Sequence, residues 1–159
     1  MLVDSNILIY AAQPAHAHLR QFIAVHASAV SAVSYVEVLG YHQLDDEERQ
    51  YLEAFFRLAR ILPLSQAVLD QAVALRQQRK MSLGDALVAG TALVHGLTLV
   101  TRNVENFQWI PGLSLLNPFD TAPPQEPEQQ QNFSVQLNQC LTPLHKEQVS
   151  CRSGTHGCF

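Results

Sequence analysis

The sequence predicts an α/β protein with helices on both faces of a five-stranded parallel sheet. Along residues 1–120, short apolar segments alternate with longer segments of helical periodicity, which is the order that βαβ units produce. The apolar segments contain few alternating polar residues, as is typical of strands buried on both faces. Together these observations favour a three-layer α/β/α sandwich.

The expected strands are short, and helices separate them. Strands are predicted at residues 1–3, 29–32, 60–64, 97–101 and 113–116. Helices are predicted at residues 16–25, 34–42, 45–58, 65–80 and 83–95, and the apolar segment 6–12 leads into the first of them. Ser65 and Ser82 stand where a serine side chain can cap the first amides of a helix, and Gly96 is a stop signal after the last one.

The composition changes near residue 120. Residues 121–159 are rich in proline and glutamine and poor in aliphatic side chains, so they cannot bury enough surface to offset the entropy of ordering. We expect one folded domain at residues 1–120 and a disordered tail at 121–159. The cysteines, Cys140, Cys151 and Cys158, all lie in that tail, so the domain should fold without disulfides, as is usual in a reducing compartment.

Hydropathy and charge bear on the protein's environment and partners. No apolar run approaches the ~20 residues of a membrane-spanning helix, and the N-terminal residues lack the features of a signal peptide. A cytoplasmic protein without membrane contact is therefore expected. The formal net charge of −4 gives no general attraction to nucleic acid, although metal ions held by acidic residues can recruit phosphate whatever the net charge.

Three acidic residues are placed to meet at one edge of the predicted sheet. Asp4 ends the first strand, and Glu37 is expected in the first turn of the helix after the second strand. Asp85 is expected in the first turn of the helix before the fourth strand, which ends at Thr101. Parallel sheets bind ligands outside the carboxyl ends of their strands, so these side chains should converge.

Metal binding and helix capping are the two roles that these acids could have. Clustered carboxylates repel one another unless a divalent cation neutralises them, and oxygen ligands suit Mg²⁺ or Mn²⁺. Such ions activate water for attack on a phosphodiester. However, Ser34-x-x-Glu37 and Ser82-x-x-Asp85 match the capping pattern, which from spacing alone is the more frequent role. Asp4 lies between apolar stretches, where an unpaired acid is rare, and its simpler role is to cap the following helix.

Four segments carry a more specific signal. They are LVDSNILIY around Asp4, SAVSYVEVLGY around Glu37, MSLGDALVAGTAL around Asp85, and the later segment LTLVTRNVENFQWIPGLSLLNPF. In this order and spacing, residues 1 to about 120 resemble the PIN domain, specifically the single-domain toxins of bacterial VapBC toxin–antitoxin pairs.

The resemblance implies a function as well as a fold. It implies Mg²⁺- or Mn²⁺-dependent hydrolysis of RNA, with Asp4 and Asp85 as the main metal ligands and Glu37 as a ligand or as the group that orients the attacking water. Asn6 and Thr101 match polar positions that support these ligands. An RNA substrate, a small antitoxin that inserts a segment at the acidic cleft, and a homodimer are implied as partners.

One segment departs from the family pattern. Where the family usually has a fourth acid, the stretch TRNVENF has Asn106, with Asn103 and Glu105 nearby as supporting residues. An amide can ligate a metal through its oxygen but brings no charge. We therefore expect one metal site rather than two, and the alternative is a PIN module that binds RNA or a protein without cleavage. A phosphatase with Asp4 as nucleophile is disfavoured, because Asn6 stands where a second aspartate would be required.

Cationic and aromatic residues near these segments also have alternative roles. Arg102 directly follows the fourth strand and is our candidate for contact with RNA phosphate. Arg76, Arg79 and Lys80 end a helix just before Ser82, where they contact RNA phosphates or, more commonly, complement the helix dipole. Some aromatic residues are expected in the core rather than stacked on bases: Tyr10, Tyr35 and Tyr41. Phe55 and Phe56 are expected either to form a partner surface or to face the sheet.

Overall fold

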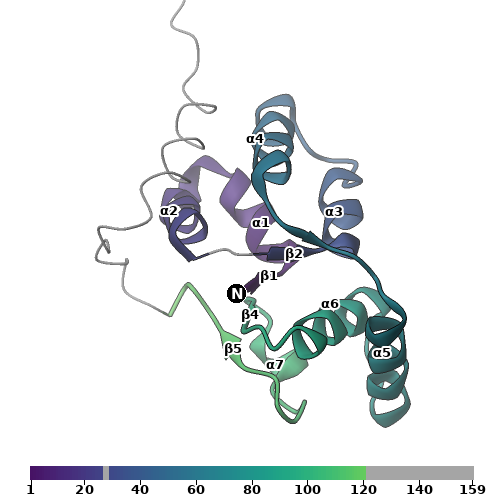
Figure 1. The fold of residues 1–159 in the computed structure, drawn as a ribbon. Coiled ribbons are helices and arrows are strands. Elements are labelled where there is room, and N and C mark those ends of the chain that lie inside the picture. Colours follow the sequence, from purple (N-terminus) through teal and green to yellow (C-terminus); the bar gives the residue numbers. More distant parts are fainter. Residues whose placement is uncertain (27–28, 121–159) are drawn as a thin grey trace, which may run out of the picture.

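A computed structural model describes residues 1–26 and 29–120 of the chain. Figure 1 shows a sheet at the centre of these residues with helices packed around it. The predicted tail at 121–159 lies outside the described residues. Within the described ranges, no helix has both the length and the apolar character needed to cross a membrane.

The sheet has five parallel strands, as predicted. They are β1 (Leu2–Val3), β2 (Ala29–Ser31), β3 (Ile61–Leu62), β4 (Leu99–Val100) and β5 (Leu115–Leu116). Their order across the sheet is β3-β2-β1-β4-β5, and every neighbouring pair is parallel. The chain leaves β1 toward β2 on one side and returns to β4 on the other, so the order reverses at β1. Parallel sheets bind ligands at such a reversal, outside the carboxyl ends of the strands.

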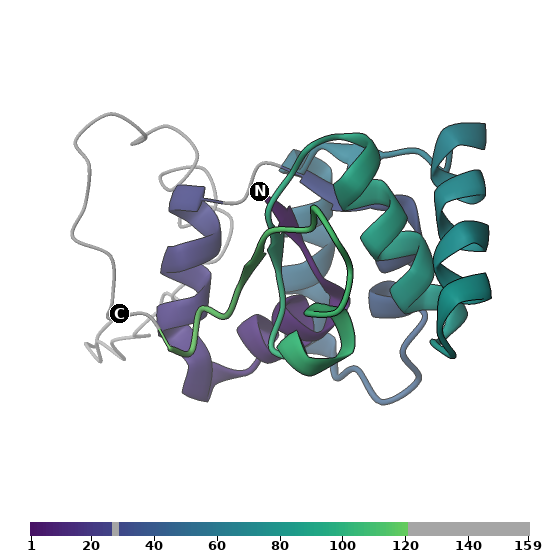
Figure 2. The ribbon, with the colours of Figure 1, turned by 90° about the horizontal axis from the view of Figure 1, so that it is seen from below.

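Helices cover both faces of this sheet. They are α1 (Ser5–Ala12), α2 (Ala17–His26), α3 (Ala32–Leu39), α4 (Asp46–Leu58), α5 (Gln66–Gln78), α6 (Leu83–Val94) and α7 (Val104–Phe107), with a short 3₁₀ turn, η1 (Pro14–His16), before α2. The helices α1, α2 and α4 gather on one side of the strands, and α5, α6 and α7 on the other (Figure 1). Seen from below in Figure 2, α2 and α6 stand on opposite sides of the strands.

Alternate strand residues build two separate apolar layers. Val3, Val30 and Val100 are fully buried in the layer that contains residues of α1, α2 and α4. Their neighbours along the strands, Leu2 and Leu99, are fully buried in the layer that contains residues of α5, α6 and α7. Successive side chains of a strand point to opposite faces, so the pattern shows a sheet buried on both sides. The predicted three-layer α/β/α sandwich is confirmed.

The first part of the chain contains more helix than the sequence analysis expected. The apolar segment 6–12 is the helix α1, which begins at Ser5, directly after β1 and Asp4. The helix expected at 34–42 is α3 and begins at Ala32, because β2 runs into it without a loop. Glu37 is therefore in the second turn of α3, and its expected place in the first turn was wrong.

Several aromatic residues are also placed differently from the expectation. Tyr35 and Tyr41 are 42% and 37% exposed, so their assignment to the core was wrong. Phe55 and Phe56 of α4 are buried and pack in the core, and Phe56 also lines a pocket with Tyr35 and Ile61. Tyr35 is on α3, with its ring centroid 5.0 Å from that of Phe56, and Tyr41 follows the helix.

Candidate active site

Asp4 is the most constrained acidic residue at the carboxyl edge of the sheet. It follows β1 directly, caps α1, and is only 6% exposed. Its Oδ1 accepts a hydrogen bond of 2.8 Å from the Ser5 amide. Its Oδ2 accepts hydrogen bonds from the Asn6 side-chain amide at 2.9 Å and from the Thr101 hydroxyl at 2.7 Å. The capping role and a ligand role are therefore compatible, because the donors fix the direction of the carboxylate.

Thr101 connects the ends of the two central strands. Its hydroxyl donates to Asp4, accepts from the Asn6 side chain at 3.2 Å, and accepts from the Asn103 amide at 3.1 Å. A hydroxyl has one donor and two acceptor positions, and all three are used here. The structure thus brings the predicted supporting residues Asn6 and Thr101 together around Asp4, with the backbone amide of Asn103 bonded to Thr101.

Glu37 reaches the same edge from the other side of β1. One of its carboxylate oxygens, Oε2, accepts a hydrogen bond of 2.5 Å from the hydroxyl of Ser5. The other oxygen, Oε1, lies against Gly84 so closely that a β-carbon on this glycine would overlap it. Gly84 immediately precedes Asp85, so the Glu37 carboxylate lies beside the start of α6. Ser34 is buried in α3 rather than acting as its cap, so the capping-box role considered for Glu37 was wrong.

Ser5 and Gly84 are site residues that the sequence analysis missed. Ser5 stands beside Asp4 in the stretch VDSN, which is a weak signal on its own. Gly84 had a clearer one, because glycine is a poor helix former and here it occupies the first turn of a helix, next to a candidate acid.

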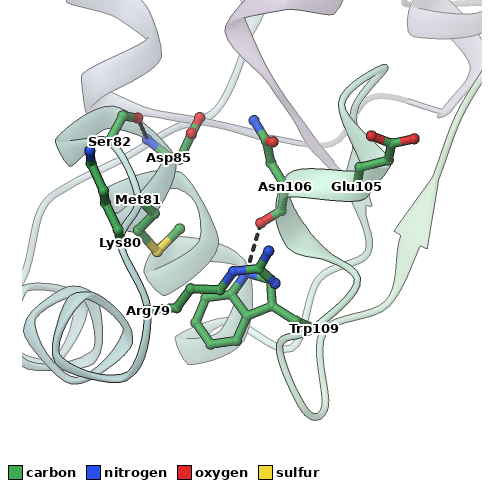
Figure 3. A pocket seen from close by; sticks show the side chains of 8 residues that line it. All are labelled: Arg79, Lys80, Met81, Ser82, Asp85, Glu105, Asn106 and Trp109. Carbon is green, nitrogen blue, oxygen red and sulfur yellow. Dashed lines mark hydrogen bonds between the residues drawn. The ribbon is translucent and has the colours of Figure 1, made fainter.

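Asp85 occupies the first turn of α6. Its backbone amide donates a hydrogen bond of 3.0 Å to the Ser82 hydroxyl, which confirms Ser82 as the helix cap. Its half-buried side chain lines a pocket of about 470 Å³ that also includes Asn106. Figure 3 shows the Asp85 carboxylate and the Asn106 amide facing each other across this pocket.

Glu105 and Asn106 are neighbours on α7 but point in different directions. Figure 3 shows the Asn106 amide turned toward Asp85 and the Glu105 carboxylate turned away from it. Successive helix residues project about 100° apart, so only one of the two can face Asp85. Both residues line the same pocket, and Asn106 is the one whose side chain is turned toward Asp85.

The neighbouring acids affect the pKa of Asp4. The pKa of the Asp4 carboxyl is raised from an ordinary 3.8 to about 6, and burial is the largest cause. The hydrogen bonds from Thr101 and Ser5 act to lower this pKa, while the negative charges of Asp85 and Glu37 act with burial to raise it. A cation among these groups would relieve both the burial penalty and the repulsion.

The acids form an open arrangement rather than a closed cage. In the part of the chain that the structure describes, no three Asp, Glu, His or Cys side chains converge as a complete ligand set for a metal ion. Mg²⁺ is commonly held by one or two carboxylates, with water and substrate phosphate completing its shell. The oxygen donors of Asp4 and Asp85 fit this kind of ion.

Arg102 extends from the end of β4 into an aromatic cluster. Its guanidinium lies 4.8 Å from the ring centroid of Tyr10 and 5.0 Å from that of Phe119. Its backbone amide donates at 3.5 Å to the Asn6 side chain, which in turn contacts Asp4. Two aromatic rings thus pack against the exposed cation, and the Arg102 backbone lies beside Asn6.

Comparisons with known proteins support this description. The PIN domain model matches residues 1–111. A chain of a toxin–antitoxin complex from Klebsiella pneumoniae is 31% identical, with 76% of this chain and 98% of that one covered and a TM-score of 0.60. A chain of DNA-bound VapBC from Salmonella typhimurium is 21% identical, with coverages of 74% and 96% and a TM-score of 0.63. A chain of VapBC2 from Rickettsia felis, bound to a promoter DNA fragment, is 23% identical, with coverages of 73% and 96% and a TM-score of 0.62.

These matches differ in what they show. The structures below 25% identity show the fold alone, and no curated protein matches the chain. The family model covers well over half of the chain and includes all three candidate acids, and PIN domains are nucleases. The chain belongs to the PIN domain family.

Proposed function

We propose that this protein is a metal-dependent endoribonuclease and the toxin of a toxin–antitoxin pair. The observation that carries the proposal is the Asp4 carboxylate, which three donors orient within the electrostatic reach of Asp85 and Glu37. A protein rarely buries an acid among like charges unless that acid has a task to perform. The PIN family membership makes hydrolysis of a phosphodiester the natural task.

In this proposal, Asp4 and Asp85 hold Mg²⁺ or Mn²⁺. When bound, such an ion lowers the pKa of a water molecule and stabilises charge on the phosphate and the leaving oxygen. The chain's own contribution is orientation, because Thr101, Asn6 and the Ser5 amide fix the Asp4 carboxylate before any ligand arrives. Groups that are oriented in advance need no reorganisation during the reaction.

Glu37 is the residue that we propose to position the attacking water or to share the metal. Its side chain is exposed, so water can reach it, yet both of its carboxylate oxygens are placed. Ser5 holds one oxygen by a hydrogen bond, and Gly84 leaves room for the other at the start of α6. A carboxylate held in this way can accept a proton from water at a defined place.

The test is incubation of the purified protein with single-stranded RNA, structured RNA and single-stranded DNA, each in Mg²⁺, Mn²⁺ or EDTA. The proposal predicts internal cleavage of RNA that requires a divalent ion and stops in EDTA. Cleavage that persists in EDTA would contradict the metal dependence. Cleavage of DNA alone would contradict RNA as the substrate.

A small protein antitoxin is the partner that we propose, acting in the cytoplasm. The toxin–antitoxin complexes among the similar structures support this proposal. So does an exposed apolar surface on α3 and β3: Tyr35 and Ile61, 42% and 39% exposed, line a pocket of about 450 Å³ together with Glu53 and Arg57, and Val36, next to Tyr35 in the chain, is 67% exposed. Contiguous exposed apolar residues commonly mark protein interfaces, and a second copy of the chain in a homodimer is also proposed for this protein.

The partner is tested by coexpression with the product of a short reading frame adjacent to the gene. Copurification of the two proteins and inhibition of cleavage are expected, and Val36→Asp should weaken the complex without changing cleavage by the free toxin. A complex that forms equally with this variant would place the interface elsewhere. Light scattering of the free protein tests the homodimer.

A PIN module that binds without cleavage remains the second candidate. Asn106 favours it, since the amide facing Asp85 brings no charge to the place where the family usually has an acid. Substitution of this residue separates the two candidates, as described below.

A further inference from the structure

The pocket beside Asp85 is lined by cationic and aromatic side chains that a metal site does not require. One wall is the connection between α5 and α6, with Arg79, Lys80 and Met81. The opposite wall is α7 and the turn after it, with Glu105, Asn106 and Trp109. Its volume of about 470 Å³ is within the usual range for sites that bind small organic groups.

The aromatic ring of Trp109 is fixed in this pocket. Its indole nitrogen donates a hydrogen bond of 2.9 Å to the backbone carbonyl of Asn106. The ring is half-buried, and the guanidinium of Arg79 lies 5.7 Å from its centroid. Figure 3 shows the Arg79 side chain lying across the ring on the side from which the pocket is viewed. One face of the indole ring therefore lies against the exposed guanidinium of Arg79, while Trp109 also packs against the apolar layer that contains residues of α6 and α7.

The two cationic side chains of the pocket are free of salt bridges within the described residues. Arg79 and Lys80 are both exposed, and neither forms a salt bridge with another residue in the ranges 1–26 and 29–120. Arg79 lies beyond the last turn of α5 in an extended conformation, so its side chain leaves the helix axis and reaches Trp109. The helix-dipole role that the sequence analysis favoured does not account for this direction.

We propose that the pocket binds one unpaired nucleotide of the RNA strand next to the cleaved bond. The base stacks on Trp109 in place of Arg79, and Arg79 and Lys80 contact the phosphates beside it. This inference rests on the proposed function, because it assumes that the strand passes the acids at Asp85. Stacking of a base on an aromatic ring is stronger than an exposed cation–π contact, so the exchange is favourable.

The ligand is a single-stranded nucleotide rather than duplex RNA. Bases within a duplex are already stacked on both faces and cannot present a face to Trp109. Stacking is tolerant of base identity, because every base has a π-face, so the subsite should hold the strand without reading its sequence.

Trp109 is the only tryptophan of the chain and therefore reports on its own site. The Asp4→Asn variant in EDTA, which under the proposed function cannot cleave, is titrated with a single-stranded oligoribonucleotide while tryptophan fluorescence and the anisotropy of a labelled strand are measured. Saturable quenching at the concentration where anisotropy reports binding is expected. The same strand in a duplex should quench far less. Binding without any change in tryptophan fluorescence would overturn the proposal.

Substitutions provide a second measurement. Trp109→Leu should weaken binding of the single strand by about tenfold, and Trp109→Phe should restore part of that loss, because phenylalanine keeps an aromatic face. Arg79→Ala should lower the dependence of affinity on salt by about one charge while quenching is kept. Arg76→Ala is the matched control, since Arg76 is exposed on α5 but does not line the pocket. Unchanged affinity in a folded Trp109→Leu protein, or equal losses in the Arg79 and Arg76 variants, would contradict the subsite.

The outcomes also separate this inference from the proposed function. Quenching by single strands in a protein that cleaves no RNA with any metal would support the nucleotide subsite and contradict the proposed nuclease. Metal-dependent cleavage without quenching would support the proposed nuclease and contradict the nucleotide subsite.

Discussion

The hydroxyl of Thr101 donates a 2.7 Å hydrogen bond to the carboxylate of Asp4, although the two residues stand 97 positions apart in the chain. This contact joins the carboxyl ends of β1 and β4, the neighbouring strands at which the sheet order reverses. It makes the acidic site a product of the sheet itself rather than of a flexible loop. The stability of the fold and the state of Asp4 should therefore depend on each other.

Asp4→Asn is expected to stabilise the metal-free protein at neutral pH. The pKa of this carboxyl is about 6 in the folded protein and 3.8 in an ordinary environment. As pH rises between these values the unfolded chain loses its proton first, so stability falls, and above the folded pKa the full penalty remains. The difference corresponds to about 3 kcal/mol, of which the variant should recover a large part.

Urea unfolding in EDTA across this pH range measures the effect. The variant and the wild type should converge in acid below the unfolded-state pKa, where both carry an uncharged group at this position. Added Mg²⁺ should raise the stability of the wild type more than that of the variant. A variant that is less stable than the wild type at neutral pH would show that the ionised Asp4 is a net stabilising group.

Gly84→Ala is expected to impair cleavage while the fold is kept. The new β-carbon overlaps Oε1 of Glu37, and because Glu37 is an exposed side chain it can move aside at little cost. Misplacement of a reacting group by about 1 Å can reduce a rate by about a hundredfold. Cleavage rates and thermal melting of the two proteins test this.

Gly96→Ala is the matched control for that substitution. Gly96 has a φ of +60° with open space around its Cα, so alanine is strained there without touching the site. The Gly96 variant should lose about 1 kcal/mol of stability and keep its cleavage rate. Equal rates for Gly84→Ala and the wild type would mean that the position of Glu37 does not matter for the reaction.

Asn106→Asp is expected to increase metal affinity and cleavage. It places a carboxylate opposite Asp85 across the pocket, where the amide now stands. The measurement is cleavage as a function of Mg²⁺ concentration, with a lower half-maximal concentration expected for the variant. Gln108→Glu, an equal change of charge at an exposed residue outside the pocket, is the control. Cleavage that appears only in the Asn106 variant would establish the binding module as the correct account of the natural chain.

Arg102→Gln is expected to weaken RNA binding for all sequences alike. The substitution removes a cation held between Tyr10 and Phe119 near Asp4, so the slope of log affinity against log salt should decrease by about one. Anisotropy of labelled RNA across a salt series measures it. Arg60→Gln serves as the control, because Arg60 precedes β3 and so lies at the opposite edge of the parallel sheet. Equal slopes for the two variants would remove Arg102 from the interface.

The sequence was sufficient for the sheet and for the convergence of its polar ends. Asp4 and Thr101 could be placed together because both follow apolar segments, and parallel strands present their carboxyl ends at one edge. The position of Glu37 on its helix could not be obtained in this way. The boundary between β2 and α3 has no loop, glycine or proline to mark it, so the helix begins earlier than its apparent serine cap.

The residues that the sequence did not reveal depend on contacts between distant elements. Gly84 matters because α3 and α6 bring Glu37 to its Cα, and nothing local indicates that approach. No local pattern singles out Trp109 in the sequence, and only the structure places its ring beside Arg79 in the pocket. The roles of such residues can be identified only from the packing of the helices in the structure.

The central claim is that Asp4 holds the metal that cleaves RNA. The most direct test is the initial rate of internal cleavage of a single-stranded RNA in Mg²⁺ by the wild-type protein and by Asp4→Asn at equal concentration. The account predicts measurable cleavage by the wild type that EDTA abolishes, and a loss of about a hundredfold or more in the folded variant. Cleavage by Asp4→Asn at the wild-type rate would contradict the account.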